Sequence, residues 1–251
     1  NQPGTYVVTV TNALNGCTNT ATVLVGQDIA PPLSEIAPAS LITCTQSAVL
    51  LDGSGSNNGP GFSYGWSTAN GLLSGPVDSI RSEAASVGTY VLQVTNLQNG
   101  CTALDSVTVS ADVNLPVAIA MPAGILNCAI TNTVIDASAS SSGPTFQYNW
   151  TTLDGLILSG GNTLMPTVGA PGIYTLNLLD TANQCSVTLA VTVSQDIAPP
   201  LAEAGQVLTL NCGTPAIALD GSGSSTGATY AYYWSSQNGH IISGDSTLSP
   251  M

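Results

Sequence analysis

Alternation of apolar and polar residues marks the clearest strand of this chain. Phe62, Tyr64 and Trp66 are separated by single small residues, so the three rings lie on one side of a predicted strand. A polar loop rich in Gly and Ser precedes the strand, over residues 52–61. A Trp that enters the middle of a strand from such a loop is typical of the core of a two-sheet sandwich.

This stretch, LDGSGSNNGPGFSYGW, has two further copies without insertion or deletion, and the three copies end at Trp66, Trp150 and Trp234. The spacing between copies is 84 residues. An internal repeat outweighs the domain count that a length of 251 residues would suggest. The other landmarks with this period are Tyr6, Tyr90 and Tyr174; Cys17, Cys101 and Cys185; Cys44, Cys128 and Cys212; and Asp28, Asp112 and Asp196.

The period predicts complete repeats over residues 31–114 and 115–198. Residues 1–30 then form the C-terminal part of a repeat, with its last two strands, and residues 199–251 form the N-terminal part of another, with its first five. We expect neighbouring repeats of the same chain, or identical subunits, to complete both ends. The Trp that ends each copy of the aromatic strand is expected to be buried.

Within residues 31–114 the pattern predicts about seven short strands, Gly/Asn turns and no helix. Four strands are the most distinct: a broken strand over Leu33–Ile42, Val49–Leu51, the aromatic strand ending near Thr68, and a strand that opens at Tyr90. A loosely patterned stretch precedes Tyr90, and Ala103–Val109 forms the last strand. The predicted fold is all-β, with tandem immunoglobulin-like antiparallel β-sandwiches in an 84-residue repeat.

The charge balance excludes several partners. The chain has 14 acidic residues, one Arg and no Lys, for a net charge of −13, so nothing could neutralise the phosphates of a nucleic acid. Anionic membrane surfaces are disfavoured for the same reason. No apolar stretch approaches 18 residues, so membrane insertion is not expected. Charged residues are only 6% of the chain, so it is not a disordered acidic tail, and with 43% hydrophobic residues it can bury cores.

The six Cys, two per repeat and without metal-type C-x-x-C pairs, indicate an oxidising compartment and an extracellular or cell-surface location. Two pairings remain open. Cys44 lies at the bottom of its predicted sandwich and Cys101 at the top, about 30 Å away, whereas a disulfide needs Cα atoms within about 7 Å. Strand geometry therefore favours a link from Cys44 to Cys185 at the junction with the next domain. Cys128 and Cys212 then pair with following domains, and Cys17 and Cys101 with preceding ones. Pairing inside each domain is expected if the first strand is short or displaced.

Candidate catalytic residues are absent from the repeat. His240 is the one imidazole, its copies are Leu72 and Leu156, and Arg81 is equally unique. A Ser-His-Asp arrangement cannot be assembled in each repeat from one His. We therefore expect no enzyme activity, no catalytic residue and no organic cofactor.

Two acidic positions recur in all three repeats. They lie at the end of the last strand and at the start of the Gly/Ser loop. Stacked domains would bring one position of each kind together at a junction, which suggests Ca²⁺ ligands. The alternative is that each Asp caps its own turn. These residues are Asp28, Asp112 and Asp196, and Asp52, Asp136 and Asp220.

The combination L-D-G-S-G-S, Y-x-W and P-G-x-Y-x-L-x-V-T-N resembles domains of the PKD type. With the added Cys residues and the D-I-A-P-P linker at Asp196–Pro200, it is similar to tandem repeats of giant surface adhesins of Bacteroidota-like bacteria. After the Trp, W-S-T-A-N-G replaces the usual W-x-F-G-D-G, so the resemblance implies a PKD-like module. It also implies extracellular spacing, adhesion or filament building without catalysis.

Four triplets resemble the O-glycosylation sequence of Bacteroidota, with Ser79, Ser106, Thr181 and Ser246 as the acceptors.

The most direct interpretation of the chain is a structural segment of an extracellular stalk, adhesin or filament. One alternative is a glycan- or surface-binding module, for which Tyr233 is the best exposed aromatic. The other is a spacer of a larger secreted enzyme.

Overall fold

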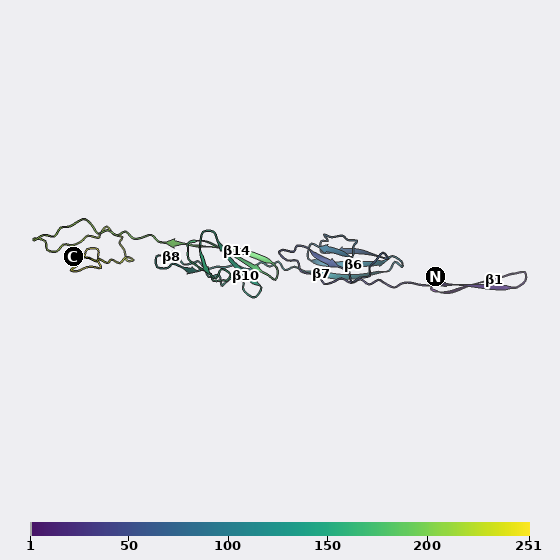
Figure 1. Ribbon diagram of the computed structural model, residues 1–251. Coiled ribbons are helices and arrows are strands. Elements are labelled where there is room, and N and C mark those ends of the chain that lie inside the picture. Colours follow the sequence, from purple (N-terminus) through teal and green to yellow (C-terminus); the bar gives the residue numbers. More distant parts are fainter. Residues whose placement is uncertain (1) are drawn as a thin grey trace.

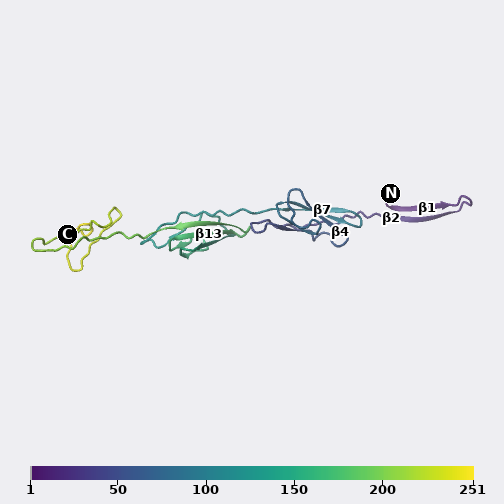
Figure 2. The same ribbon diagram turned by 90° about the horizontal axis from the view of Figure 1, so that it is seen from above.

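The computed structural model describes residues 2–251, and within that range it contains β-strands and no helix. Four parts follow one another along a line in both views: an N-terminal hairpin, two sandwiches and a C-terminal segment (Figures 1 and 2). The buried hydrophobic residues form two separate clusters, one in each sandwich. The fold is therefore a linear array of units, with the hairpin at one end and the C-terminal segment at the other.

The N-terminal hairpin consists of β1 (Gly4–Thr11) and β2 (Thr18–Val25). The strands are antiparallel, with Gly4 opposite Val25 and Tyr6 opposite Val23. Neither strand pairs with any other strand of the described residues. The hairpin matches the predicted last two strands of a repeat.

The sandwich of residues 31–114 has two antiparallel sheets, ordered β4-β6-β7 and β3-β5. Trp66 in β4 lies opposite Leu92 in β6, and Tyr90 lies opposite Val107 in β7. Ile42 adds an isolated parallel bridge to Ala111, just beyond β7. The strands are β3 (Val49–Asp52), β4 (Phe62–Thr68), β5 (Arg81–Ala84), β6 (Gly88–Asn96) and β7 (Thr102–Val109).

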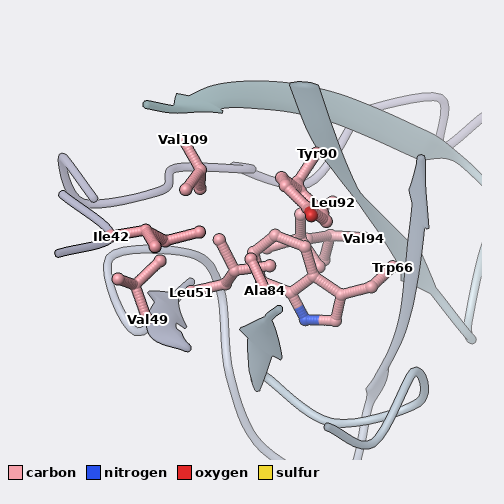
Figure 3. Close-up of a cluster of buried hydrophobic side chains, with 9 residues drawn as sticks. All are labelled: Ile42, Val49, Leu51, Trp66, Ala84, Tyr90, Leu92, Val94 and Val109. Carbon is pink, nitrogen blue, oxygen red and sulfur yellow. The ribbon is translucent and has the colours of Figure 1, made fainter. Parts of the chain in front are cut away.

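The two sheets enclose the core around Trp66 (Figure 3). Tyr90, Leu92 and Val94 of β6 are fully buried because they alternate on the inner face, while Gln93 between them is exposed. The indole nitrogen of Trp66 donates a hydrogen bond to the carbonyl oxygen of Ser79 at 2.9 Å, which satisfies its polar atom in an apolar site.

Residues 115–198 repeat this architecture with sheets ordered β10-β13-β14 and β11-β12-β9. Trp150 lies opposite Leu176, as Trp66 lies opposite Leu92. A short parallel pair, β15 with β8, takes the place of the bridge from Ile42. The strands are β8 (Leu126–Asn127), β9 (Thr133–Val134), β10 (Phe146–Thr152), β11 (Ile157–Ser159), β12 (Thr167–Val168), β13 (Gly172–Asp180), β14 (Cys185–Val193) and β15 (Gln195–Asp196).

The recurring Tyr forms a tyrosine corner at the start of the penultimate strand. The hydroxyl of Tyr90 donates to the carbonyl oxygen of Ser86 at 2.8 Å and accepts from the backbone nitrogen of Leu72 at 3.0 Å. The hydroxyl of Tyr174 makes the equivalent bond to Ala170 at 2.7 Å. Such a corner is typical of immunoglobulin-like sandwiches, so these hydrogen bonds agree with the strand order.

The loosely patterned stretch, for which no particular strand was named, contains β5, which pairs with β3. Three expectations were wrong. Leu33–Ile42 forms no strand, because Pro38 and the preceding prolines remove backbone donors. Residues 201–251 form no strand, and Trp234 is half-buried where burial was expected, because the strands that would cover it are not part of this segment.

The C-terminal segment nevertheless keeps several of the hydrogen bonds that hold the loops of a complete repeat. The indole nitrogen of Trp234 donates to the carbonyl oxygen of Thr247 at 2.9 Å, as Trp150 does to Thr163 at 3.0 Å. The backbone nitrogen of Gly221 donates to Leu248 at 2.8 Å. The segment is thus arranged as the first part of a sandwich.

Candidate functional site: the junction between successive domains

A disulfide joins Cys44 in the first sandwich to Cys185 in the second, with an S–S distance of 1.96 Å and a Cα–Cα distance of 5.0 Å. The two cysteines are 141 residues apart in sequence. Cys44 follows the stretch that enters the first sandwich, and Cys185 opens β14 immediately after the hairpin turn. This is the junction link that strand geometry favoured over the pair Cys44–Cys101.

A buried Asn binds the linker at this junction. Asn183 is 2% exposed, and its Nδ2 atom donates to the Oδ1 atom of Asp112 and to the carbonyl oxygen of Asn114, both at 3.0 Å. Its Oδ1 atom accepts from the backbone nitrogen of Cys185 at 3.0 Å. The backbone nitrogen of Cys44 donates to the carbonyl oxygen of Asn183 at 3.2 Å. One residue thus connects the first domain, the linker and the second domain.

The junction between the hairpin and the first sandwich uses the same contacts. The Nδ2 atom of Asn99 donates to the Oδ1 atom of Asp28 and to the carbonyl oxygen of Ala30, both at 3.1 Å. Its Oδ1 atom accepts from the backbone nitrogen of Cys101 at 2.9 Å. The contact is therefore a repeated property of the chain, although only the second junction has a disulfide within residues 2–251.

Sequence reasoning treated these Asn residues only as turn formers. The signal that identifies their role is the recurrence of Asn two residues before Cys, at Asn15, Asn99 and Asn183. Gln184 replaces the intervening Gly of the other two copies and has a φ of 60°, in the left-handed region. A residue with a side chain is strained there, so the close turn at this junction is held at some energetic cost.

The six recurrent Asp residues cap their own turns, as the alternative to Ca²⁺ binding proposed. In each case the Oδ1 atom accepts a hydrogen bond from the backbone nitrogen two residues later, at 2.9–3.3 Å. No group of three or more His, Cys, Asp or Glu side chains gathers as a metal site within residues 2–251. Ca²⁺ binding stays a prediction, and the turns account for these Asp: Asp28, Asp52, Asp112, Asp136, Asp196 and Asp220.

Hydrogen bonds lower the pKa of four of these carboxyl groups. The amide of Asn183 is the main cause for Asp112, followed by the backbone of Asn114. Ser138 lowers the pKa of Asp136 in the same way. Ser222 does so for Asp220. A carboxylate that accepts such bonds is stabilised in its charged form, so these turns are strongest above the ordinary pKa of Asp.

Arg81 forms an ion pair with Asp52 across the β3-β5 sheet. Its Nε atom lies 3.1 Å from the Oδ1 atom of Asp52. The guanidinium hydrogen bond is the main reason why the pKa of Asp52 falls to about 2, with Ser54 adding to it. Arg81 therefore has an ion-pair partner in its own sandwich, although its side chain is 58% exposed.

The remaining candidate residues lie on separate surfaces. His240 is exposed, and Tyr233 is 83% exposed beside the half-buried Trp234. Among the predicted glycosylation acceptors, Ser106 and Ser246 are exposed and Ser79 is half-buried. Thr181 is also half-buried, and its hydroxyl donates to the carbonyl oxygen of Thr145 at 2.7 Å. Glycosylation stays a prediction, with the two exposed Ser as the accessible sites.

No helix among the described residues is long and apolar enough to cross a membrane.

No protein-family model matches the chain. The dyslexia-associated protein KIAA0319-like protein of Mus musculus is 28% identical to this chain over 260 residues. The match covers 92% of this chain and 25% of the relative, so the chain spans about a quarter of the relative's length.

Solved structures that are similar to the chain include an I-band fragment from titin, with a TM-score of 0.35, 13% identity, and coverage of 77% of this chain and 75% of that chain. The N-terminal eight Ig domains of Down Syndrome Cell Adhesion Molecule have a TM-score of 0.36 and 13% identity, and the match covers 77% of this chain and 28% of that chain. Sidekick-1 immunoglobulin domains 1–4 have a TM-score of 0.33 and 17% identity, and the match covers 78% of this chain and 59% of that chain. The immunoglobulin-like fold of this chain rests on its own strand order and core.

Proposed function

We propose that the chain is a non-catalytic structural segment of an extracellular stalk, adhesin or filament. The observation that carries this proposal is the disulfide between Cys44 and Cys185, because it gives consecutive domains a second covalent connection beside the polypeptide linker. Two connections at separate points restrain both bending and twisting, whereas one linker alone acts as a hinge. The hydrogen bonds of Asn183 add a third restraint at the same place.

The linear arrangement of the domains supports a spacing role (Figure 2). A strand of ten residues spans roughly 33 Å, so each repeat adds about 35–45 Å of reach. Proline-containing linkers such as Ile197–Pro200 favour extended backbone and so limit collapse at the junction. Length and stiffness are thus the properties that the repeats supply.

The inter-domain disulfide also supports an extracellular or cell-surface location, since such bonds persist in oxidising environments. The PKD-like pattern, including the L-D-G-S-G-S stretch at Leu51, supports a place among the surface adhesins of Bacteroidota-like bacteria. Partners are then further repeats or identical subunits, and glycans attached to exposed Ser residues.

A binding module is the second candidate, because Tyr233 presents an exposed ring beside Trp234. Exposed aromatic rings are frequent in binding surfaces. The equivalent residues of Tyr233 are Gly65 and Asn149, so the feature belongs to one repeat only. A structural role is preferred because the Cys and Asn positions that form the junction recur with the period of the chain.

Small-angle X-ray scattering of the monomeric chain tests the structural role. We expect a narrow rod-like distance distribution for the wild type, and a broader one with shorter mean length for Cys44→Ser/Cys185→Ser. The control, Cys128→Ser, removes an exposed Cys that has no disulfide partner within residues 2–251 and should scatter like the wild type. A wild-type chain that is as bent and variable as the double variant would reject the proposal.

A further inference from the structure

The segment that leads from the junction into the second sandwich carries a stripe of exposed apolar side chains. At every second position from residue 113 to residue 121 the side chain is aliphatic or Met, and it is between 45% and 64% exposed. This apolar stripe consists of Val113, Leu115, Val117, Ile119 and Met121. Between these positions, Pro116 is buried, and Ala118 and Ala120 pack against the second core. Such alternation indicates extended backbone, so the five side chains lie on one side of it.

Hydrogen bonds hold the apolar stripe in a fixed position on the second sandwich. The backbone nitrogens of Val117 and Ile119 donate to serine hydroxyls of a later loop, both at 2.9 Å, and that of Met121 donates to a carbonyl oxygen at 2.8 Å. At the junction, Asn183 binds the carbonyl oxygen of Asn114 at 3.0 Å. Figure 2 shows this teal segment running from the first sandwich along one edge of the second. A partner would therefore meet an ordered surface, and little conformational entropy would be lost on binding.

The corresponding segments of the other two copies carry a charge at the fourth position of the stripe. Ile119 corresponds to Glu35 in the first sandwich and to Glu203 in the C-terminal segment, and both acidic side chains are exposed. The second sandwich is thus the one copy in which all five positions are uncharged and apolar. In a chain with a net charge of −13, two molecules can meet at this place without opposing carboxylates within the contact.

The size of the apolar stripe fits a contact between proteins. Its five half-exposed side chains present roughly 500 Å² of mostly apolar surface, which is within the range of surface patches that are often functional. Two copies that bury this surface against each other would remove roughly 1,000 Å² from water, close to the lower limit for a specific interface.

We propose that the apolar stripe is a lateral contact between two copies of this chain, which joins two stalks side by side at the level of the second sandwich. An identical partner fits because its stripe is equally long, extended, apolar and uncharged, so no polar group is buried without a partner. In a two-fold contact the central residue meets its own copy, which places Val117 next to Val117 of the second copy. This inference deepens the proposed structural function and rests on it, since side-by-side contact of stiff rods builds a filament.

Sedimentation equilibrium of the chain measures this pairing. Free thiols are first alkylated with iodoacetamide, so that new disulfides cannot join copies. We expect a reversible equilibrium between monomer and dimer, with a dissociation constant on the order of 100 µM because the contact is small. The dimer fraction should increase with salt, which screens the repulsion between two chains that each carry a net charge of −13.

Ile119→Glu tests whether the apolar stripe forms the contact. The variant places a charge inside the contact and should raise the dissociation constant at least about tenfold. The fold accepts this side chain, since Glu35 and Glu203 occupy the same position in the other copies. Ile173→Glu is the matched control, because Ile173 is 51% exposed on β13 and lies in a surface pocket that is lined by Leu153 and by no residue of the stripe. The control should pair like the wild type.

Cross-linking locates the centre of the contact. Val117→Cys is prepared in a background where Ser replaces the four cysteines that have no disulfide within residues 2–251, so the Cys44–Cys185 bond is kept. A short bis-maleimide should link two copies through position 117. Ile173→Cys in the same background is the control and should remain monomeric, because it lies outside the stripe.

Three results would overturn the inference. They are a wild type that stays monomeric at about 1 mM, ten times the expected dissociation constant, a dimer that Ile119→Glu and Ile173→Glu weaken equally, or cross-linking at position 117 no faster than at position 173. If the wild type is monomeric and scatters X-rays as a straight rod, the lateral contact is rejected and the structural function stands. A bent and variable monomer would reject the structural function itself.

Discussion

Removal of the inter-domain disulfide should destabilise both sandwiches, and the structure gives the size of the effect. The bond closes a loop between residues 141 apart in sequence, which contains most of the first sandwich and much of the second. Loop-closure entropy for this length corresponds to an upper value of about 5 kcal/mol, and measured disulfides usually give less. We expect Cys44→Ser/Cys185→Ser to lower the free energy of unfolding by about 3–5 kcal/mol.

Urea unfolding followed by Trp fluorescence measures this effect, since Trp66 and Trp150 report on the two cores. With a slope of about 1–1.5 kcal/mol per molar urea for domains of this size, the midpoint should fall by about 2–5 M. Cys128→Ser/Cys212→Ser is the control, because neither residue has a disulfide partner within residues 2–251. Equal midpoints for the wild type and the double variant would show that the bond does not constrain the unfolded chain as reasoned here.

Three further perturbations test other parts of the structure. Trp150→Ala should cost about 3–5 kcal/mol in its domain, measured by urea unfolding, and a loss below about 1 kcal/mol would contradict its place in the core. Gln184→Gly should stabilise the chain by roughly 1 kcal/mol in the same assay, because Gly tolerates the positive φ; a loss of stability would refute the strain. The folded-state pKa of Asp52 is lowered to about 2, so its ion pair with Arg81 contributes fully above pH 4 and is lost between pH 4 and pH 2. Asp52→Asn should remove this part of the pH dependence of the free energy of unfolding, by less than about 1 kcal/mol because Arg81 is exposed. An unchanged dependence of stability on pH would reject a stabilising role of the ion pair.

The sequence predicted the strands whose apolar alternation is strongest. The aromatic strand and the strand from Tyr90 lie at the expected residues, because large side chains on alternate positions define a buried face. β5 was missed because Arg81–Ala84 places only Ser82 and Ala84 inside, and these small residues give no hydrophobic signal. A strand over Leu33–Ile42 was wrong because proline prevents regular pairing there.

The junction was predictable in part. The height of a sandwich was enough to favour the pair Cys44–Cys185, since Cys residues at opposite ends of one domain are too far apart. The role of Asn183 was not visible, because Asn before Gly or Gln is typical of any tight turn. Its burial depends on two domains meeting, and no local pattern encodes that contact. The half-exposure of Trp234 was missed for a related reason, since the strands that would cover it belong to no part of the C-terminal segment.

The central claim is that a covalent bond joins successive domains, and cyanogen bromide mapping of the unreduced monomer tests it most directly. Cleavage after Met121 and Met165 places Cys44 in fragment 1–121 and Cys185 in fragment 166–251. The account predicts that these two fragments stay linked until reduction, while fragment 122–165 is released. Pairing inside each domain would instead release fragment 1–121 and link 122–165 to 166–251 through Cys128, and that result would contradict the account.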